Sequence, residues 1–211
     1  MKRAIAAASL CFAATGAQAD VFGLLNGRTA NILSEPQTTV EAGFVSADDF
    51  TTFGGRLNFK LSPNSLFYGT IANIDADNQE DEIAFGGGVV YQLTQNSRNN
   101  FDVAIKGSYH LWSTETFLGR DADFSDFGLE LILSPKGQAL AQGVGIYASI
   151  GFHKLSSDVD LGIFGNAEQS DSEISFGLGA TLAAGPGEAY AAFENIEDTY
   201  IGFGYRLALG Q

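Results

Sequence analysis

Apolar and polar residues alternate with a period of two along many separate segments of this chain. In residues 53–61, for example, Leu57 and Phe59 fall on one face of an extended strand, whereas Arg56 and Lys60 fall on the other. Successive side chains of a strand point to opposite sides, so this pattern predicts strands with one apolar and one polar face. Ten such strands are expected, at residues 38–46, 51–61, 66–75, 82–93, 100–113, 126–134, 144–157, 173–183, 188–194 and 199–209.

The lengths of these segments point to a membrane. Most have nine or more residues, whereas ordinary strands have five or six, and a tilted strand that crosses a bilayer needs about 9–11. Residues 188–194 are short and residues 66–75 alternate poorly, so eight strands remains an alternative to ten. Since lipid cannot satisfy exposed backbone groups, strands that cross it must close on themselves. The fold predicted is all-β, an antiparallel up-and-down transmembrane β-barrel.

The first 19 residues have the features of a secretory signal peptide. Lys2 and Arg3 form a basic start, an apolar stretch covers residues 4–15, and Ala17–Ala19 is a small-residue cleavage site. The apolar stretch is too short to span a bilayer as a helix. Residues 1–19 are therefore expected to be removed, which directs the rest of the chain out of the cytoplasm.

Composition excludes several kinds of function. The only cysteine, Cys11, lies inside the signal peptide, and Leu10 before it does not fit a lipoprotein signal. The mature chain then has no disulfide, thiolate metal site or cysteine nucleophile. A net charge of −14 also argues against binding nucleic acid through its phosphates. The 26 glycines and four prolines argue against a helical protein.

The connections between the predicted strands alternate in charge. Those at residues 62–65, 96–100, 135–143 and 185–187 form turns without acidic residues. An up-and-down sheet with an even number of strands explains this, because alternate hairpins emerge at opposite ends. The other five connections carry 19 of the 25 acidic residues and form an expected acidic rim: Asp48, Asp49, Asp75, Asp77, Glu80, Asp81, Glu82, Glu115, Asp121, Asp123, Asp126, Asp158, Asp160, Glu168, Asp171, Glu173, Glu194, Glu197 and Asp198.

The last predicted strand carries a spacing that outer-membrane barrels present to the barrel-assembly machinery. Tyr200, Gly202, Tyr205 and Leu207 match its order of polar residue, glycine and two aromatic or apolar residues, although Tyr200 is an imperfect polar match and the chain runs on to Gln211. Together with the strand pattern, this resembles the small single-chain outer-membrane β-barrels of Gram-negative bacteria, of the OmpA-like and OmpX-like type. The resemblance implies location in the cell outer membrane, both termini on the periplasmic side and the acidic rim outside.

The same resemblance implies the partners. These are outer-membrane lipid, lipopolysaccharide and the assembly machinery during biogenesis, with the barrel itself a monomer. Residues 38–211 form the expected barrel domain, and residues 20–37 an N-terminal periplasmic segment. In that segment, apolar residues at helical spacing before Pro36 suggest a short amphipathic helix, and a frayed extension of the first strand is the equal alternative.

The polar faces of the predicted strands would point into the barrel lumen. They form either a solute pathway or a network of paired charges that fills a narrow interior. The network is favoured because small barrels have room for little beyond side chains, and buried charges must be paired. The expected lumen residues are Glu41, Arg56, Lys60, Asp102, Lys106, His110, Glu130, His153 and Arg206.

The sequence offers little material for catalysis. His110 and Ser113 are three residues apart, as are His153 and Ser156, and this spacing places each pair on opposite faces of a strand. No catalytic residue is therefore expected, and the chain is predicted not to be an enzyme. An outer-membrane enzyme acting on envelope lipid is the alternative.

Three pairs of loop aspartates are candidate cation ligands, since Mg²⁺ and Ca²⁺ prefer carboxylate oxygens. No run matches a twelve-residue calcium loop, so a solvated rim without a cofactor is favoured. Weak bridging of the rim to lipopolysaccharide phosphates by Mg²⁺ or Ca²⁺ is the weaker alternative. The pairs are Asp75 and Asp77, Asp121 and Asp123, and Asp158 and Asp160.

The function expected is passive, either structural in the envelope or a narrow porin-like route for small solutes. Besides the enzyme, a soluble secreted barrel that binds a small apolar ligand is an alternative, because either face of the strands can point inward. Tyr68, Tyr91, Phe101 and Tyr205 are expected near the turns, where they would form an aromatic girdle at the membrane interface. This favours the apolar face outward.

Overall fold

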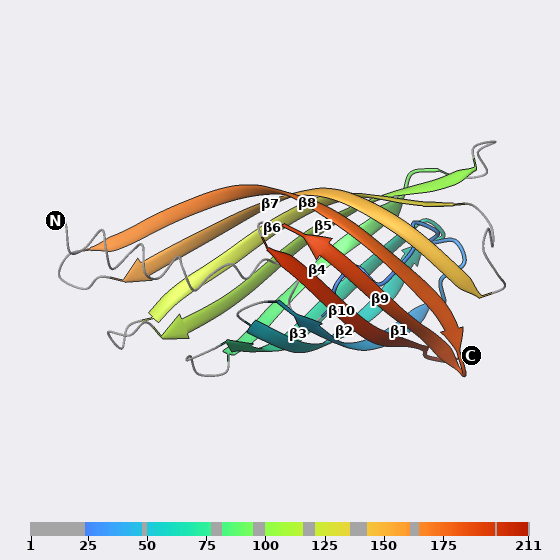
Figure 1. Cartoon of the computed structure of the whole chain (residues 1–211), viewed down its shortest axis with the longest axis horizontal. Coiled ribbons are helices and arrows are strands. Elements are labelled where there is room, and N and C mark those ends of the chain that lie inside the picture. Colours follow the sequence, from blue (N-terminus) through green and yellow to red (C-terminus); the bar gives the residue numbers. More distant parts are fainter. Residues whose placement is uncertain are drawn as a thin grey trace.

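The protein forms a closed barrel of antiparallel strands, seen from the side in Figure 1. The computed structural model describes residues 24–47, 50–76, 82–94, 100–115, 121–135, 143–160, 165–196 and 198–210. The strands are β1 (Thr38–Ser46), β2 (Phe50–Ser62), β3 (Ser65–Ala76), β4 (Glu82–Gln92), β5 (Phe101–Glu115), β6 (Asp121–Pro135), β7 (Val144–Asp160), β8 (Asn166–Ala184), β9 (Gly187–Asn195) and β10 (Thr199–Ala208).

Each strand pairs with its neighbours in the chain, and the pairing of β1 with β10 closes the circle. In the closing pair, Glu41 of β1 lies opposite Arg206 of β10, and on its other side Glu41 lies opposite Arg56 of β2. The ten-strand prediction is confirmed, and the eight-strand alternative is wrong. None of the described residues forms a helix long and apolar enough to cross a membrane.

The strands bury their polar side chains and expose their apolar ones. On β2, Phe53 is 63% exposed, whereas the inward-facing Arg56 is 4% exposed. The same alternation runs through β1, where every second residue is buried. This is the inverse of a water-soluble barrel, so the alternative of a soluble apolar-ligand carrier is wrong. A closed barrel with an apolar outer surface is the only form in which strands cross lipid.

Several strands extend past the length that a membrane requires. The strand β8 has 19 residues and begins at Asn166 rather than at the expected residue 173. Most of residues 166–173 are exposed, and they pair with the end of β7, as in the pair Val159 and Ala167. These residues do not alternate in polarity because both faces of the hairpin are solvated. Figure 1 shows the β7–β8 ribbon reaching beyond the other strands.

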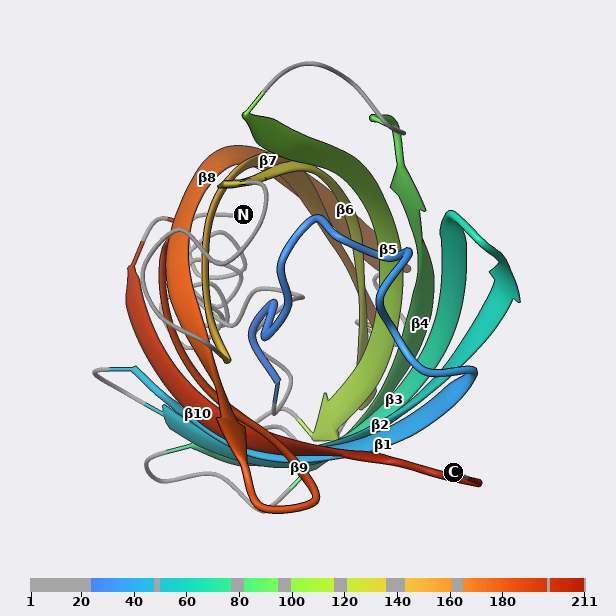
Figure 2. The same cartoon turned by 90° about the vertical axis from the view of Figure 1, so that its right-hand side faces the viewer.

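The segment before β1 lies inside the barrel, as the blue trace in Figure 2 shows. Residues 24–37, called the plug from here on, contain no helix or strand, so both conformations considered from the sequence are wrong for them. Leu24, Leu25 and Ile32 are fully buried within the lumen. Their apolar spacing reflects packing against the inner wall rather than a helical period.

Candidate functional site in the barrel lumen

The inward faces hold the polar residues expected there. Lys60 is only half-buried, and its Nζ donates to the backbone carbonyls of Leu33 and Glu35, each at 2.9 Å. The other eight expected lumen residues are all at most 5% exposed: Glu41, Arg56, Asp102, Lys106, His110, Glu130, His153 and Arg206. The period-two pattern therefore placed these side chains on the correct face.

The first group in the lumen, called the arginine cluster, joins the plug to the wall. It consists of Arg28 and Glu35 from the plug and Glu41, Arg56 and Arg206 from the barrel. Arg28 forms a buried ion pair with Glu41, while Arg206 bonds Glu35 at 2.6 Å and contacts Glu41 at 3.1 Å. Arg56 lies 3.6 Å from the second oxygen of Glu41. One glutamate thus contacts three guanidinium groups, each from a different part of the chain.

Wall side chains also bind the backbone of the plug. Ser134 Oγ accepts from the Ala30 amide at 3.0 Å, and Gln92 Oε1 accepts from the amides of Ile32 and Leu33 at 2.9 and 3.1 Å. Arg56 donates to the Leu24 carbonyl at 2.9 Å. An irregular segment buried in this way needs such partners, because its own backbone makes no secondary-structure ladder. The wall and the plug are therefore complementary in hydrogen bonding as well as in charge.

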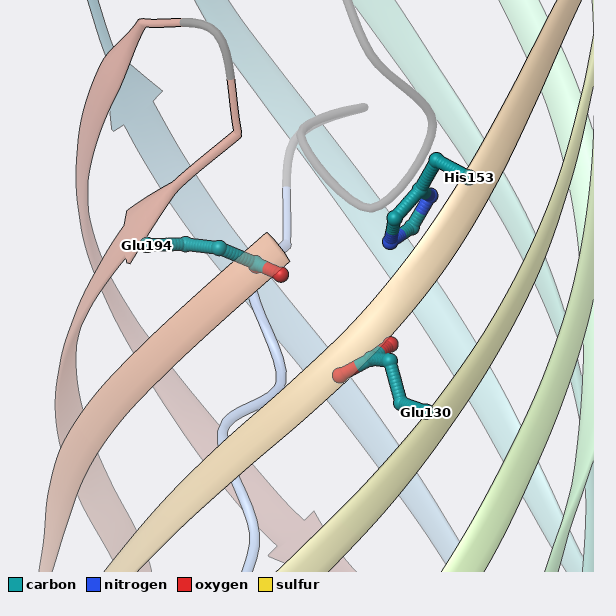
Figure 3. A group of neighbouring side chains, drawn as sticks. All are labelled: Glu130, His153 and Glu194. Carbon is teal, nitrogen blue, oxygen red and sulfur yellow. The ribbon is translucent and has the colours of Figure 1, made fainter. Parts of the chain in front are cut away.

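The second group, called the acid–histidine cluster, consists of Lys106 on β5, Asp126 and Glu130 on β6, His153 on β7 and Glu194 on β9. Lys106 Nζ donates to Glu130 Oε1 at 2.7 Å, and Asp126 Oδ2 lies 3.5 Å from His153 Nδ1. Potential ligand atoms of Glu130, His153 and Glu194 all lie within 4.8 Å of one another. Figure 3 shows these three side chains converging from three strands.

An apolar group lines the lumen near the ends of the strands that carry the acidic connections. Trp112 and Phe124 stack there with ring centroids 5.2 Å apart. Ala72, Ile74, Ala84 and Ala122 complete this cluster of buried residues. Along the inward face of β5, Asp102 lies beside the plug-binding Gln92, Lys106 follows, and Trp112 comes last. The acid–histidine cluster therefore lies between the plug and this apolar group.

Three tyrosines point into the lumen beside glycines of neighbouring strands, and the sequence did not predict this packing. Tyr68, Tyr147 and Tyr190 are each at most 5% exposed, so Tyr68 is not a girdle residue as expected. A Cβ atom at Gly88, Gly179 or Gly204 would collide with their rings. The sequence did contain inward glycines on the neighbouring strands, but a glycine on the inward face also fits an unfilled lumen. The glycines instead make room for large side chains that fill the lumen.

The other girdle residues and the assembly spacing lie on the expected strands. Tyr91 and Phe101 are exposed on the outer face, and the Tyr205 hydroxyl donates to the Ala184 carbonyl. Tyr200 and Gly202 are buried, whereas Tyr205 and Leu207 are half-buried on β10. All four residues therefore belong to the strand that closes the barrel. Their recognition by the assembly machinery stays a prediction.

Two of the acidic residues assigned to the rim lie elsewhere. Asp126 and Glu194 are at most 2% exposed and belong to the lumen, so that part of the rim assignment is wrong. They lie at the loop-side ends of the expected strands 126–134 and 188–194, where they occupy inward positions. Residue number relative to a turn was thus a weaker guide than strand parity.

The candidate cation ligands on the rim come together across strands. Asp123 of β6 lies opposite Asp158 of β7, which lies opposite Glu168 of β8; these three are called the carboxylate row. Ser113 Oγ donates to Asp123 Oδ1 at 2.6 Å. Asp75 is exposed and lies opposite Thr51, apart from the row. Asp77 and the side chains of Asp121 and Asp160 lie outside the described residues.

A serine, a histidine and an aspartate also meet in the lumen. His110 and Ser113 lie on opposite faces as expected, with Ser113 exposed. Instead, Ser108 Oγ and the His153 ring both lie against Gly128, and Asp126 is next to His153. Ser108 is 4% exposed, and no hydrogen bond joins its hydroxyl to His153 among the described residues. At this depth the group is closed to an envelope lipid.

Comparisons with known proteins identify no family for this chain. No protein-family model and no curated protein matches the chain. Among solved structures, it is similar to Ail of Yersinia pestis in complex with sucrose octasulfate, with 16% identity, 82% of this chain and 99% of Ail covered, and a TM-score of 0.42. It is also similar to the KdgM porin in complex with disordered oligogalacturonate, with 10% identity, 82% of this chain and 99% of KdgM covered, and a TM-score of 0.45. A third similar structure is the outer-membrane protease OmpT of Escherichia coli, with 8% identity, 81% of this chain and 91% of OmpT covered, and a TM-score of 0.41.

At these values the comparisons carry no argument about what the chain binds or does. The location follows from the molecule itself. Its ten strands close without a free edge, its outer surface exposes large apolar side chains, and its charges are buried inside. Bacterial barrels with this inverted arrangement are those of the outer membrane. The chain is an integral outer-membrane β-barrel protein.

Proposed function

We propose that this protein has a structural role in the envelope, as a barrel whose lumen is closed to solutes. The plug is the observation that carries the proposal. It lies inside the barrel, and Arg28 within it is 1% exposed. A conducting pore needs a continuous aqueous path, whereas the plug, the buried clusters and the apolar group occupy the lumen one after another.

The contacts of the plug support a fixed closure. Its anchors come from β1, β2, β4, β6 and β10, and they include ion pairs to Glu41 and Arg206 as well as bonds to backbone groups. Moving the plug would leave buried charges without their partners, and removing one partner of a buried pair costs about 3–5 kcal/mol. This cost favours a permanent filling over a gate that opens easily.

The proposed partners follow from the outer surface. The apolar belt faces outer-membrane lipid, the carboxylate row faces lipopolysaccharide, and the strand β10 carries the spacing for the assembly machinery. Closure by β1 and β10 leaves no strand edge, among the described strands, to pair with a second copy. This supports a monomer. Absence of catalysis stays a prediction, supported by the burial of Ser108, His153 and Asp126.

Single-channel recording in planar bilayers tests the proposal. We expect no sustained conductance from the intact barrel and clear conductance steps when residues 24–37 are deleted. The double variant Arg28→Ala with Glu35→Ala should show intermittent openings, because it loosens the plug and retains the chain. Leu33→Ala is the matched control, since Leu33 is an exposed residue of the same segment.

Two results would contradict the proposal. Sustained conductance of the intact barrel would instead support the narrow porin-like role. A deletion variant that folds, as judged by faster migration on unheated gels, and yet does not conduct would show that the plug is not what closes the lumen.

A further inference from the structure

The acid–histidine cluster holds the donor atoms of a metal site. One imidazole and two carboxylates, from His153, Glu130 and Glu194, place ligand atoms within 4.8 Å of one another. All three residues are at most 2% exposed, so they are not a solvated surface cluster. They come from β6, β7 and β9, and the closed barrel fixes their relative positions (Figure 3).

Carboxylates outnumber cations among the side chains named in this cluster. Asp126, Glu130 and Glu194 are buried carboxylates, and Lys106 forms an ion pair with Glu130. With neutral imidazoles, these named side chains have a net charge of −2. A group of buried carboxylates and an imidazole is an environment that favours a divalent cation.

Three buried hydroxyl groups give a second, independent indication of a ligand. Ser108, Tyr147 and Ser175 are each at most 5% exposed, and their hydroxyl oxygens have no hydrogen-bond partner among the described residues. Buried polar groups are almost always satisfied by protein or by ordered water. Unsatisfied hydroxyls at this depth indicate that a polar guest belongs in this part of the lumen.

The glycines fix where these hydroxyls lie. Ser108 Oγ and the His153 ring both lie against Gly128, and Ser175 Oγ and the Glu130 side chain both lie against Gly151. The hydroxyls of Ser108 and Ser175 therefore lie beside two of the three candidate ligands, His153 and Glu130. Water bound to a metal ion would satisfy them, because such water both donates and accepts hydrogen bonds.

Asp126 occupies the place of an orienting residue. Metal-bound histidines commonly donate their second ring N–H to a carboxylate, which fixes the tautomer and the ring direction. Asp126 Oδ2 lies 3.5 Å from His153 Nδ1, which leaves Nε2 as the ligand atom. Figure 3 shows a ring nitrogen of His153 turned toward the two carboxylates. The bond from Lys106 to Glu130 is compatible with ligation, because a carboxylate has two oxygens.

We propose that the lumen binds one divalent transition-metal ion through Glu130, His153 and Glu194. Asp126 orients His153, and the hydroxyls of Ser108 and Ser175 hold water at the remaining coordination positions. A mixed set of nitrogen and oxygen ligands suits Zn²⁺ and its neighbours, whereas Mg²⁺ and Ca²⁺ prefer oxygen alone. The ion would join β6, β7 and β9 from the inside of the barrel.

Metal analysis of the refolded full-length barrel tests the proposal. The barrel is refolded in detergent with Zn²⁺, passed over a chelating resin and analysed by mass spectrometry for bound metal. We expect one Zn²⁺ per barrel, and visible absorption bands when Co²⁺ replaces Zn²⁺. Glu194→Gln and His153→Gln should lose the retained metal. Asp198→Asn is the control, since Asp198 is an exposed acidic residue just beyond the same strand.

Faster migration on unheated gels shows which variants have folded. If Glu194→Gln does not fold, Asp126→Asn replaces it and should weaken Zn²⁺ affinity by about 10–100-fold, as loss of an orienting carboxylate does. The proposal is overturned if the intact barrel retains no metal, if folded ligand variants retain as much as the intact barrel, or if Asp198→Asn loses the metal. Equal retention of Mg²⁺ would likewise overturn the assignment to a transition metal.

Discussion

The two charged clusters of the lumen differ in the balance between acidic and basic side chains. In the arginine cluster, Arg28, Arg56 and Arg206 are matched by Glu35 and Glu41, and Glu188 lies 3.6 Å from Arg206. The acid–histidine cluster sets three carboxylates against Lys106. With Glu188 included, the first group has no net charge, whereas the named side chains of the second have a net charge of −2 with a neutral imidazole. Apart from Glu188, whose side chain is 35% exposed, the members of both clusters are almost fully buried.

This contrast indicates that the two clusters have different roles at different depths of the barrel. The balanced cluster holds the plug and needs nothing from outside. The unbalanced cluster lies deeper, beneath the apolar group, and has features of a binding site.

The largest effect is expected in the balanced cluster. Glu41→Ala removes the carboxylate that contacts Arg28, Arg56 and Arg206, and it leaves their buried charges uncompensated. We expect a loss of about 3–5 kcal/mol in the free energy of unfolding, the usual cost of breaking a buried pair from one side. Urea unfolding in lipid vesicles measures it. Asp198→Asn should be within about 0.5 kcal/mol of the unchanged protein, as surface substitutions are; similar losses in both would contradict the network.

A smaller effect is expected from a single methyl group added beside the second cluster. A Cβ at Gly128 would lie 2.5 Å from Ser108 Oγ and 2.9 Å from His153 Cε1, so both side chains must shift. Overpacking of this kind costs about 1–3 kcal/mol. Gly107→Ala is the matched control on the neighbouring strand, because nothing lies within 4 Å of its added Cβ. Equal unfolding midpoints for the two variants would show that the lumen is loosely packed.

These glycines also show which contacts could not be predicted from the sequence. Period-two alternation fixed the strands and the inward position of residues such as Glu41 and His153, because parity is a local property. It could not show that Gly128 lies against His153, since that depends on the register between two strands. The plug was missed for a related reason. Its contacts join Arg28 to Glu41 and Ala30 to Ser134, and no local pattern encodes pairings at such separations.

The candidate site was predictable only in part. Glu130 and His153 were both expected in the lumen, but Glu194 and Asp126 were assigned to the rim because they lie close to loops. Both residues already lay within the expected strands, so their parity in those strands decides their position in the lumen. Strand parity alone would have recovered Asp126, which lies an even number of residues from Glu130.

The third prediction concerns Lys106, which forms an ion pair with Glu130 in the acid–histidine cluster. Lys106→Met removes a positive charge 2.7 Å from Glu130 and leaves the carboxylates more dependent on a bound cation. We expect Zn²⁺ to bind at least about tenfold more tightly, which corresponds to 1.4 kcal/mol. The metal-free form should be less stable than the unchanged barrel. Competition with a coloured chelator measures the affinity, and an unchanged or weaker affinity would show that Lys106 does not compete with the metal.

The smallest effect is expected on the rim, where Asp123 and Glu168 of the carboxylate row are exposed and Asp158 is half-buried. Asp123, Asp158 and Glu168 lie directly opposite one another on β6, β7 and β8, and like charges in such positions destabilise a sheet. Mg²⁺ should relieve this repulsion by bridging, whereas Na⁺ at equal ionic strength only screens it. We expect a stabilising difference below about 1 kcal/mol, the range for exposed charges. Replacing the row with Asn, Asn and Gln should abolish the difference, while Asp75→Asn should leave it, because Asp75 faces Thr51. Thermal unfolding in detergent with magnesium chloride or sodium chloride measures it. If the two salts give identical midpoints, the rim is a solvated surface, and cation binding in this barrel is confined to the lumen.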